Sequence, residues 1–189
     1  MQLRRYVLTL WSACVVAMAL PAVGCTAQPT AGASAPAFNA TDSAWILLMI
    51  PMAERARLLT DLAPSRTADR ALAALAADTG ATLRADLSRL RAVLRLSGVP
   101  DTHPHEGHDM PGMVSLDTLR KASDANGQAF DRILTDALRA HFAQSGMLCS
   151  SERARGGADR AKDLAAAIAK STAVGASRLD ELRGAQPRL

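Results

Sequence analysis

The segment from His103 to Met113 gathers most of the side chains in this sequence that could bind a metal ion. It reads His-Pro-His-Glu-Gly-His-Asp-Met-Pro-Gly-Met, and it contains three of the four histidines and two of the seven methionines of the chain. Its two prolines and two glycines prevent a helix or strand from continuing through it, so we expect a turn-rich connecting loop. Imidazole nitrogen and thioether sulfur suit copper better than they suit cations that prefer oxygen.

The spacing of the histidines fits such a site. His103 and His105 are separated by one residue, and His105 and His108 by two, so two imidazoles can reach one ion. Histidine-rich loops also bind Ni²⁺ and Zn²⁺, but Cu²⁺ has the highest intrinsic affinity of the three. The loop therefore predicts a copper site with the ligands His103, His105, His108, Met110 and Met113. The alternative is a solvated surface linker without a metal.

The first residues read as an export signal rather than as part of the fold. Arg4 and Arg5 precede an apolar stretch from Tyr6 to Leu20, and small residues then lead to Cys25. This pattern predicts a lipoprotein-type signal over residues 1–24, with Cys25 lipidated and holding the protein to the cell membrane on its extracytoplasmic side. An ordinary signal peptide or an uncleaved anchor remains the alternative. Residues 25–41, rich in Ala, Ser, Thr, Pro and Gly, are expected to form a flexible tether.

Charge and composition narrow the classes of function. Removing the two signal arginines lowers the net charge from +4 to +2, and aromatic residues make up only 3% of the chain. The remaining arginines are mixed with acidic residues instead of forming a basic stripe, so we do not expect nucleic-acid binding. With Cys14 in the signal and Cys25 lipidated, Cys149 is left without a disulfide partner, and a packed core must stabilise the fold.

The rest of the chain is predicted to be helical. A first helix, capped by Asp42 or Ser43 and interrupted at Pro51, carries an apolar stripe at spacings of three and four residues. After a turn at Pro64–Ser65 and a cap at Thr67, a second helix is expected over about 68–96. Its stripe comprises Leu72, Leu75, Thr79, Leu83, Leu87, Leu90 and Val93.

The second half repeats this plan. Ser115 is expected to cap a short helix that stops near Asn126–Gly127, and two longer helices follow, separated by Gly156–Gly157. The stripe of the first of them comprises Phe130, Leu134, Ala137, Leu138, His141, Ser145 and Leu148. The stripe of the last comprises Ala161, Leu164, Ile168, Thr172, Ala176, Leu179 and Leu182.

The two halves superimpose with a constant offset of 89 residues, which places Met49 on Leu138 and Leu75 on Leu164. The simplest interpretation is a duplicated helical hairpin that forms an all-α, ferritin-like four-helix bundle over residues 42–186. The repeats cover about 43–97 and 127–184, and a connecting loop at 98–115 follows the first. The same offset places Met52 on His141, both on inward stripes. They form a second candidate metal position, or they simply fill the core.

No catalytic pattern is present. The chain lacks the Glu-x-x-His pairs of carboxylate di-iron sites, the G-x-S-x-G motif and the P-loop pattern. Cys149 has only His141 near it along a helix, and we interpret it as a core residue. We therefore do not expect an enzyme.

Several short patterns resemble those of the ferritin-like domain of unknown function 305 (DUF305) family. They are Met49-Ile50-Pro51, the block Asp109–Met113, Phe130-Asp131 before an apolar helix, and the duplicated hairpin, which together span about residues 43–182. The resemblance implies a ferritin-like bundle and a link to copper binding. Each hairpin of that family normally opens with Met-Ile-x-His-His. Here Met52 and Ala53 replace the first pair, and His141 followed by Phe142 replaces the second, so metal binding is expected mainly in the loop.

These observations predict an extracytoplasmic, lipid-anchored protein that binds copper for storage, buffering or delivery. The alternative is a non-catalytic structural or interaction domain that has lost the metal site of the family. The sequence leaves the protein partner, the identity of the metal and the oligomeric state open.

Overall fold

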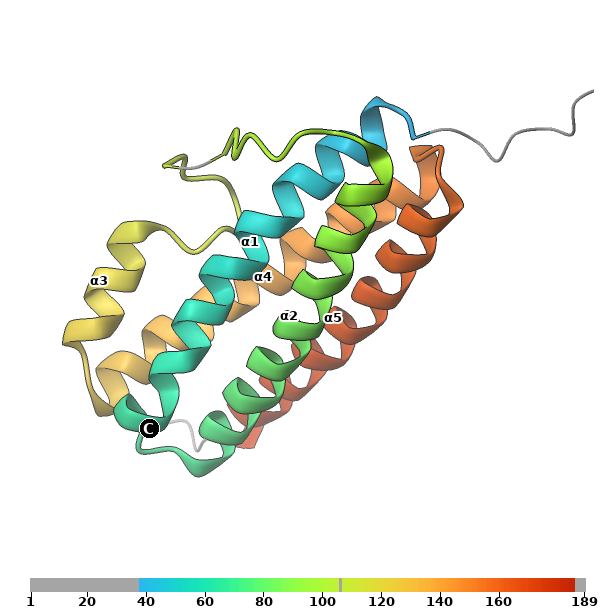
Figure 1. Ribbon diagram of the computed structural model, residues 1–189. Helices are drawn as coiled ribbons and strands as arrows, with labels where there is room; N and C mark the ends of the chain where they lie inside the picture. The colour runs from blue at the N-terminus through green and yellow to red at the C-terminus, as the bar shows by residue number, and fades with distance from the viewer. Residues whose placement is uncertain (1–37, 106, 186–189) are drawn as a thin grey trace, which may run out of the picture. The chain divides into compact units, whose positions relative to one another are not determined.

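The computed structural model describes residues 38–105 and 107–185. The expected signal segment, Cys25 and the tether up to residue 37 lie outside the described residues. Within the described ranges the chain forms five helices and no strand: α1 (Ala40–Arg66), α2 (Arg70–Ser97), α3 (Leu116–Asp124), α4 (Gly127–Arg155) and α5 (Asp159–Ala185) (Figure 1). The all-α prediction is confirmed. Among these helices, none combines the length and apolarity that are needed to cross a membrane.

The first helix begins earlier than the sequence pattern suggested. Asn39 is its N-cap, and the Asn39 side chain accepts hydrogen bonds from the backbone N–H groups of Thr41 and Asp42. Asp42 accepts a bond from the Asn39 backbone in return, which completes a capping box. The prediction of Asp42 or Ser43 as the cap was therefore wrong, because Asp42 occupies the third helical position.

Neither proline in α1 ends the helix, although a turn was predicted at Pro64–Ser65. The helix passes through Pro51 and Pro64 and ends at Arg66, with Thr67 as its C-cap and Asp69, rather than Thr67, as the N-cap of α2. Packing around Pro51 offsets the lost backbone hydrogen bond, since residues on both sides of it are buried in the core. Helix α2 ends at Ser97, one residue beyond the predicted end near residue 96, and Gly98 adopts the left-handed conformation (φ 70°) that suits a C-cap.

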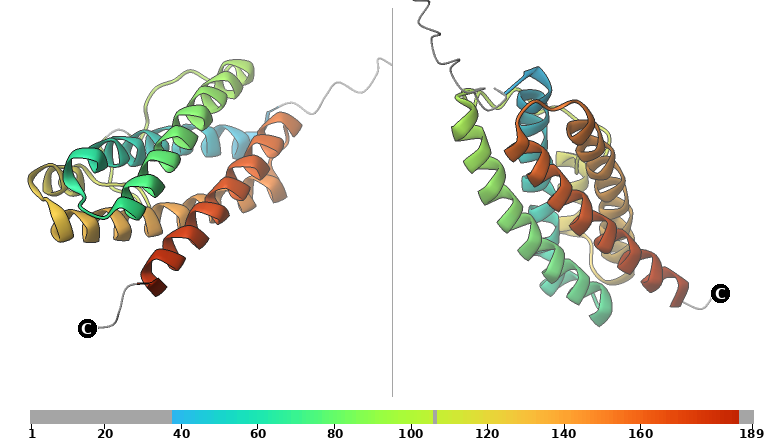
Figure 2. Two further views of the ribbon diagram at one scale, coloured as in Figure 1. Left: turned by 90° about the horizontal axis from the view of Figure 1, so that it is seen from below. Right: turned by 90° about the vertical axis from the view of Figure 1, so that its right-hand side faces the viewer.

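The helices are arranged as two hairpins packed side by side. Helix α1 packs mainly against α2, and α4 packs mainly against α5, while α1–α4 and α2–α5 contacts join the hairpins. Each hairpin is antiparallel, and the segment from Gly98 to Asn126, which includes α3, crosses from the end of α2 to the start of α4 (Figure 1). In the right-hand view of Figure 2, α2 and α5 lie in front of α1 and α4. A bundle with one long crossover is the ferritin-like arrangement.

Equivalent helix ends in the two hairpins are separated by the offset found in the sequence. Helices α1 and α4 end at Arg66 and Arg155, and α2 and α5 begin at Arg70 and Asp159. Both pairs differ by 89 positions, which is the register expected for a duplicated hairpin.

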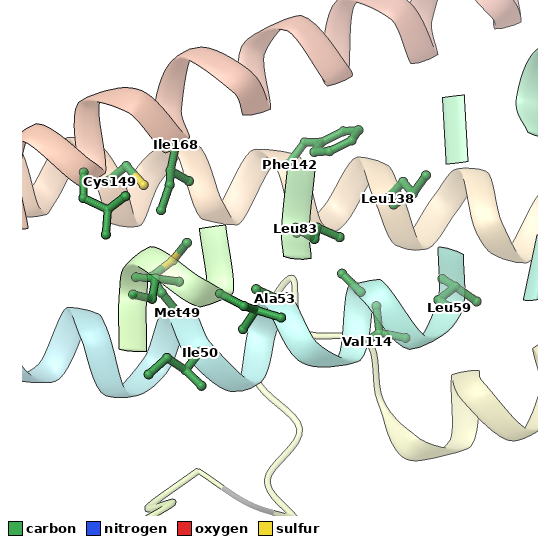
Figure 3. Close-up of a cluster of buried hydrophobic side chains, with 14 of the residues drawn as sticks. Met49, Ile50, Ala53, Leu59, Leu83, Val114, Leu138, Phe142, Cys149 and Ile168 are labelled. Atoms are coloured by element: carbon green, nitrogen blue, oxygen red, sulfur yellow. The ribbon is translucent and has the colours of Figure 1, made fainter. Parts of the chain in front are cut away.

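The predicted apolar stripes form the core. Every residue of the α2 stripe is buried, and Phe130, Leu134 and Leu138 of α4 have 0% exposure. Figure 3 shows Met49, Ala53 and Leu59 of α1 on the same side of that helix, toward side chains of α4 and α5. Cys149 is fully buried among them, and burial raises the pKa of its thiol to about 12, so it is an inert core residue.

Candidate functional site

The loop between α2 and α3 contains two successive turns. In each turn the first and last residues carry the same kind of candidate metal ligand. The His108 N–H donates to the His105 carbonyl over 3.3 Å, and the Met113 N–H donates to the Met110 carbonyl over 3.0 Å. Such i to i+3 turns hold their first and last residues within about 7 Å. The imidazoles of one turn and the thioethers of the other are thus neighbours along a short stretch of backbone.

The first part of the loop lies on the surface. The side chains of His103 and His108 are exposed, and His105 is half-buried. His103 has a left-handed backbone (φ 46°), and its Nδ1 lies 3.4 Å from the Asp101 carboxylate. The three predicted histidine ligands are therefore accessible to an ion from solvent.

The second part of the loop is anchored to the bundle. Arg55 of α1, which is only 8% exposed, donates from Nη1 to the His108 carbonyl over 3.1 Å and lies 3.6 Å from the Asp109 carboxylate. Met110 is half-buried, whereas Met113 and Val114 are buried. The loop is thus a docked segment over Met110–Val114 with a more exposed arm before it.

A glycine is required where the loop meets α4. Gly112 has φ 73°, and a Cβ atom there would lie 2.2 Å from Gln144 Cβ and 2.8 Å from the Ala140 carbonyl oxygen. The loop backbone therefore touches α4 on either side of position 141. This contact brings the Met110–Met113 turn beside His141, which the sequence could not establish.

His141 is a buried neutral imidazole. It is 3% exposed, and burial lowers its pKa to about 4, against a smaller opposing effect of the Gly112 backbone. Its Nε2 lies 3.5 Å from Ser145 Oγ, a long contact, and its Nδ1 has no hydrogen-bond partner of good geometry within the described chain. A neutral imidazole is the form that binds a metal.

The other interior positions supply fewer donors. Met52 is fully buried on α1, as its stripe predicted, but Ala53 and Phe142 contribute only hydrocarbon. Within the described residues, no cluster of three or more His, Cys, Asp or Glu side chains is placed to hold a metal. The interior therefore offers one imidazole, the thioethers of Met49 and Met52 and the protonated thiol of Cys149, and the exposed histidines lie only in the loop.

Arg55 is the anchor that sequence reasoning missed, and replacing it should release the loop. In Arg55→Met the His108 carbonyl and Asp109 lose their partner, while the aliphatic part of the side chain is retained. We expect faster amide hydrogen exchange over residues 108–113 and a loss of about 1–3 kcal/mol in unfolding free energy. Hydrogen-exchange mass spectrometry checks this, with exposed Arg120→Met of α3 as the control. Unchanged exchange in the loop would show that Arg55 does not anchor it.

A buried pair of carboxyl groups lies at one end of the bundle, also unpredicted. Asp42 and Glu152 both have 0% exposure. Burial opposes ionisation of Asp42, but hydrogen bonds from the backbone of Asn39, Ala158 and Gly157 together lower its pKa. Burial and the nearby Asp42 raise the pKa of Glu152 to about 8. Glu152 is therefore mainly protonated at neutral pH, and within the described chain neither of its carboxyl oxygens makes a hydrogen bond of good geometry.

An all-α bundle of two hairpins with one long crossover and a donor-rich loop defines the structural class of the protein. Residues 42–183 match the family described as "Domain of unknown function (DUF305)", and the chain belongs to this family. No curated protein matches the chain.

Two crystal structures of family members share the fold. A DUF305 protein of Streptomyces coelicolor, presented as a candidate secreted protein, superimposes with a TM-score of 0.68 at 19% sequence identity, covering 79% of this chain and 97% of its own. A DUF305 fragment from Deinococcus radiodurans superimposes with a TM-score of 0.72 at 18% identity, covering 80% of this chain and 100% of its own. At these identities the similarity establishes the fold alone.

Proposed function

We propose that this chain is an extracytoplasmic, lipid-anchored protein that binds copper through the His103–Met113 loop, for storage, buffering or delivery. The observation that carries the proposal is the pair of successive turns, one bounded by His105 and His108 and the other by Met110 and Met113. Imidazoles suit Cu²⁺ and thioethers suit Cu⁺, so adjacent turns of the two kinds can hold either oxidation state.

Export and anchoring rest on different observations. The basic start, apolar stretch and Cys25 of the sequence support a lipoprotein signal. The Streptomyces coelicolor relative described as a candidate secreted protein supports export for this chain as well. A protein held outside the cytoplasm meets copper before the ion enters the cell, which suits a buffering or delivery role.

The contacts that anchor the loop favour metal binding there, compared with binding by an unanchored segment. Arg55 holds His108 and Asp109 on α1, and Gly112 packs the second turn against α4, so less conformational entropy is lost when a metal orders the loop. The exposed histidines can collect the ion, and Met110 and the neutral His141 stand near the anchored part. We therefore assign the main site to the loop, with His141 and Met52 as possible additional ligands.

Isothermal titration of the mature protein with Cu²⁺ and Cu⁺ tests the proposal. The variant with His103, His105 and His108 changed to alanine is expected to lose Cu²⁺ affinity by about a hundredfold or more, because each lost ligand weakens the site. Met110→Leu combined with Met113→Leu keeps the packing and should weaken Cu⁺ more than Cu²⁺. Equal heats from wild type and the triple histidine variant would reject the loop as the site.

The second candidate function is a structural or interaction domain. It is favoured by the interior, where Met52, Ala53 and Phe142 are buried and pack in place of the histidines expected from the family pattern. A protein of this kind should show no copper-dependent rise in melting temperature, whereas a ligand that binds only the native state must raise it. Recovery of one stable protein partner from the membrane fraction would support this alternative.

A further inference from the structure

The bundle contains a cavity that is separate from the His/Met loop. It has a volume of about 400 Å³, opens between α2 and α5 and reaches α1 and α4. Its apolar wall includes Met49, Leu75, Leu90, Phe142 and Ile168. A volume of this size is within the range of small-molecule sites.

Two small residues of α5 lie in the wall of the cavity. Ala167 and Gly175 line it, and a Cβ on Gly175 would lie 2.7 Å from Phe142 Cζ, so the Phe142 ring already rests on the glycine backbone. The Phe142 ring therefore fills the space beside Gly175 and forms part of the cavity wall.

A buried carboxylate faces this apolar space. Asp86 of α2 is 5% exposed and lines the cavity. Within the described chain no group donates a hydrogen bond to it, and its nearest cation is Arg89 Nη1 at 3.8 Å, on a side chain that is 55% exposed. Burial raises the pKa of Asp86 above its usual value. A carboxylate this buried normally has a hydrogen-bonded partner, so the donor to Asp86 must come from what occupies the cavity, water included.

The other charged groups that line the cavity do not donate a hydrogen bond to Asp86. Asp78 is paired with Arg178 across α2 and α5 at 2.8 Å, and both are exposed. Lys170 is also exposed on α5. Thr79, His141 and Ser145 provide additional buried polar atoms in the wall. The deepest formal charge in the cavity is thus the negative charge of Asp86.

We propose that the cavity binds a small organic cation, a primary amine with an aromatic or bulky aliphatic body. The ammonium group would donate to Asp86, and the body would cover Phe142, Ile168 and Leu75. An anionic ligand would place its charge near the Asp86 carboxylate, and a neutral apolar ligand would leave this carboxylate without a donor. Arg89 makes only a long contact and can turn to solvent when the amine enters.

Titration calorimetry of the metal-free protein tests the inference with 1-naphthylmethylamine, the neutral 1-naphthalenemethanol and the anionic 1-naphthoate. The amine is expected to bind saturably and about tenfold or more tightly than either analogue. The three compounds share one ring system, so the comparison isolates the charge without any change in the protein. Equal affinities, tighter binding of the naphthoate or no saturable binding of the amine would overturn the proposal.

Two variants locate the charge that is recognised. Asp86→Asn keeps the size of the side chain and should weaken the amine about tenfold or more, while Asp78→Asn, at the exposed rim, should stay within about twofold. Circular dichroism and the melting temperature confirm that each variant is folded. The triple loop-histidine variant should bind the amine like wild type, so failure of the copper proposal and failure of this one are distinguishable. Retained amine affinity in Asp86→Asn would overturn the assignment to Asp86.

Discussion

Replacing Asp42 with alanine is expected to lower the free energy of unfolding by about 3–5 kcal/mol, because it removes the acceptor of several buried hydrogen bonds at once. The Asp42 carboxylate accepts from the Gly157 N–H at 3.0 Å and from the Ala158 N–H at 3.1 Å. It thereby joins the start of α1 to the turn between α4 and α5. Without it, these N–H groups lose their acceptor.

Urea unfolding followed by circular dichroism at neutral pH measures this effect. Asp136→Ala on α4 is the matched control, since the Asp136 side chain is 77% exposed and pairs only with Arg139 three residues away. The free energy of unfolding of Asp136→Ala should stay within about 0.5 kcal/mol of the wild-type value. A loss below about 1 kcal/mol in Asp42→Ala would mean that the connection at this end of the bundle contributes little to stability.

Replacing Glu152 with glutamine is expected to remove a pH dependence of stability. The pKa of Glu152 is about 8 in the folded protein, against 4.5 as the ordinary value. Because the folded state binds the proton more tightly, the contribution of Glu152 is fully present below 4.5 and is lost as the pH rises to about 8. Glutamine resembles the protonated acid and does not titrate. The free energy of unfolding of Glu152→Gln, relative to that of wild type, should therefore increase with pH across this window, to about 4 kcal/mol.

The comparison of the two proteins at each pH isolates Glu152 from His141. The pKa of His141 is lowered from 6.5 to about 4, so its contribution is present above 6.5 and is lost as the pH falls toward 4. That dependence is common to wild type and Glu152→Gln, and it cancels in the difference between them. Parallel stability curves for the two proteins would show that Glu152 is ionised in the folded state.

The bundle was predictable because its signals are periodic. Leu72, Leu83 and Leu90 fall on one helical stripe, and burial of that stripe drives α2 against its neighbours. The offset of 89 residues also predicted which positions of the two hairpins are equivalent. The helix ends were less predictable, because α1 continues through Pro64 to Arg66 against the local preference of proline.

The composition of the candidate site was readable from the loop, but its geometry was not. Pro and Gly indicated turns, whereas the bond from Arg55 to the His108 carbonyl joins residues 53 positions apart. The same applies to Asp42 and Gly157, which are 115 positions apart. Asp86 lies three residues after Leu83 and four before Leu90, on the buried stripe of α2, but only the fold shows that it faces a cavity between α2 and α5. Contacts of this kind depend on how helices pack, and periodicity within one helix does not encode them.

The proposed function requires that the loop histidines hold copper in the native membrane. The direct measurement is the metal content of untagged protein purified from its native membrane, compared between wild type and the variant with His103, His105 and His108 changed to alanine. We predict copper bound in a fixed ratio to wild-type chains and little copper in the variant. Equal copper in both proteins, or none in wild type, would contradict the assignment.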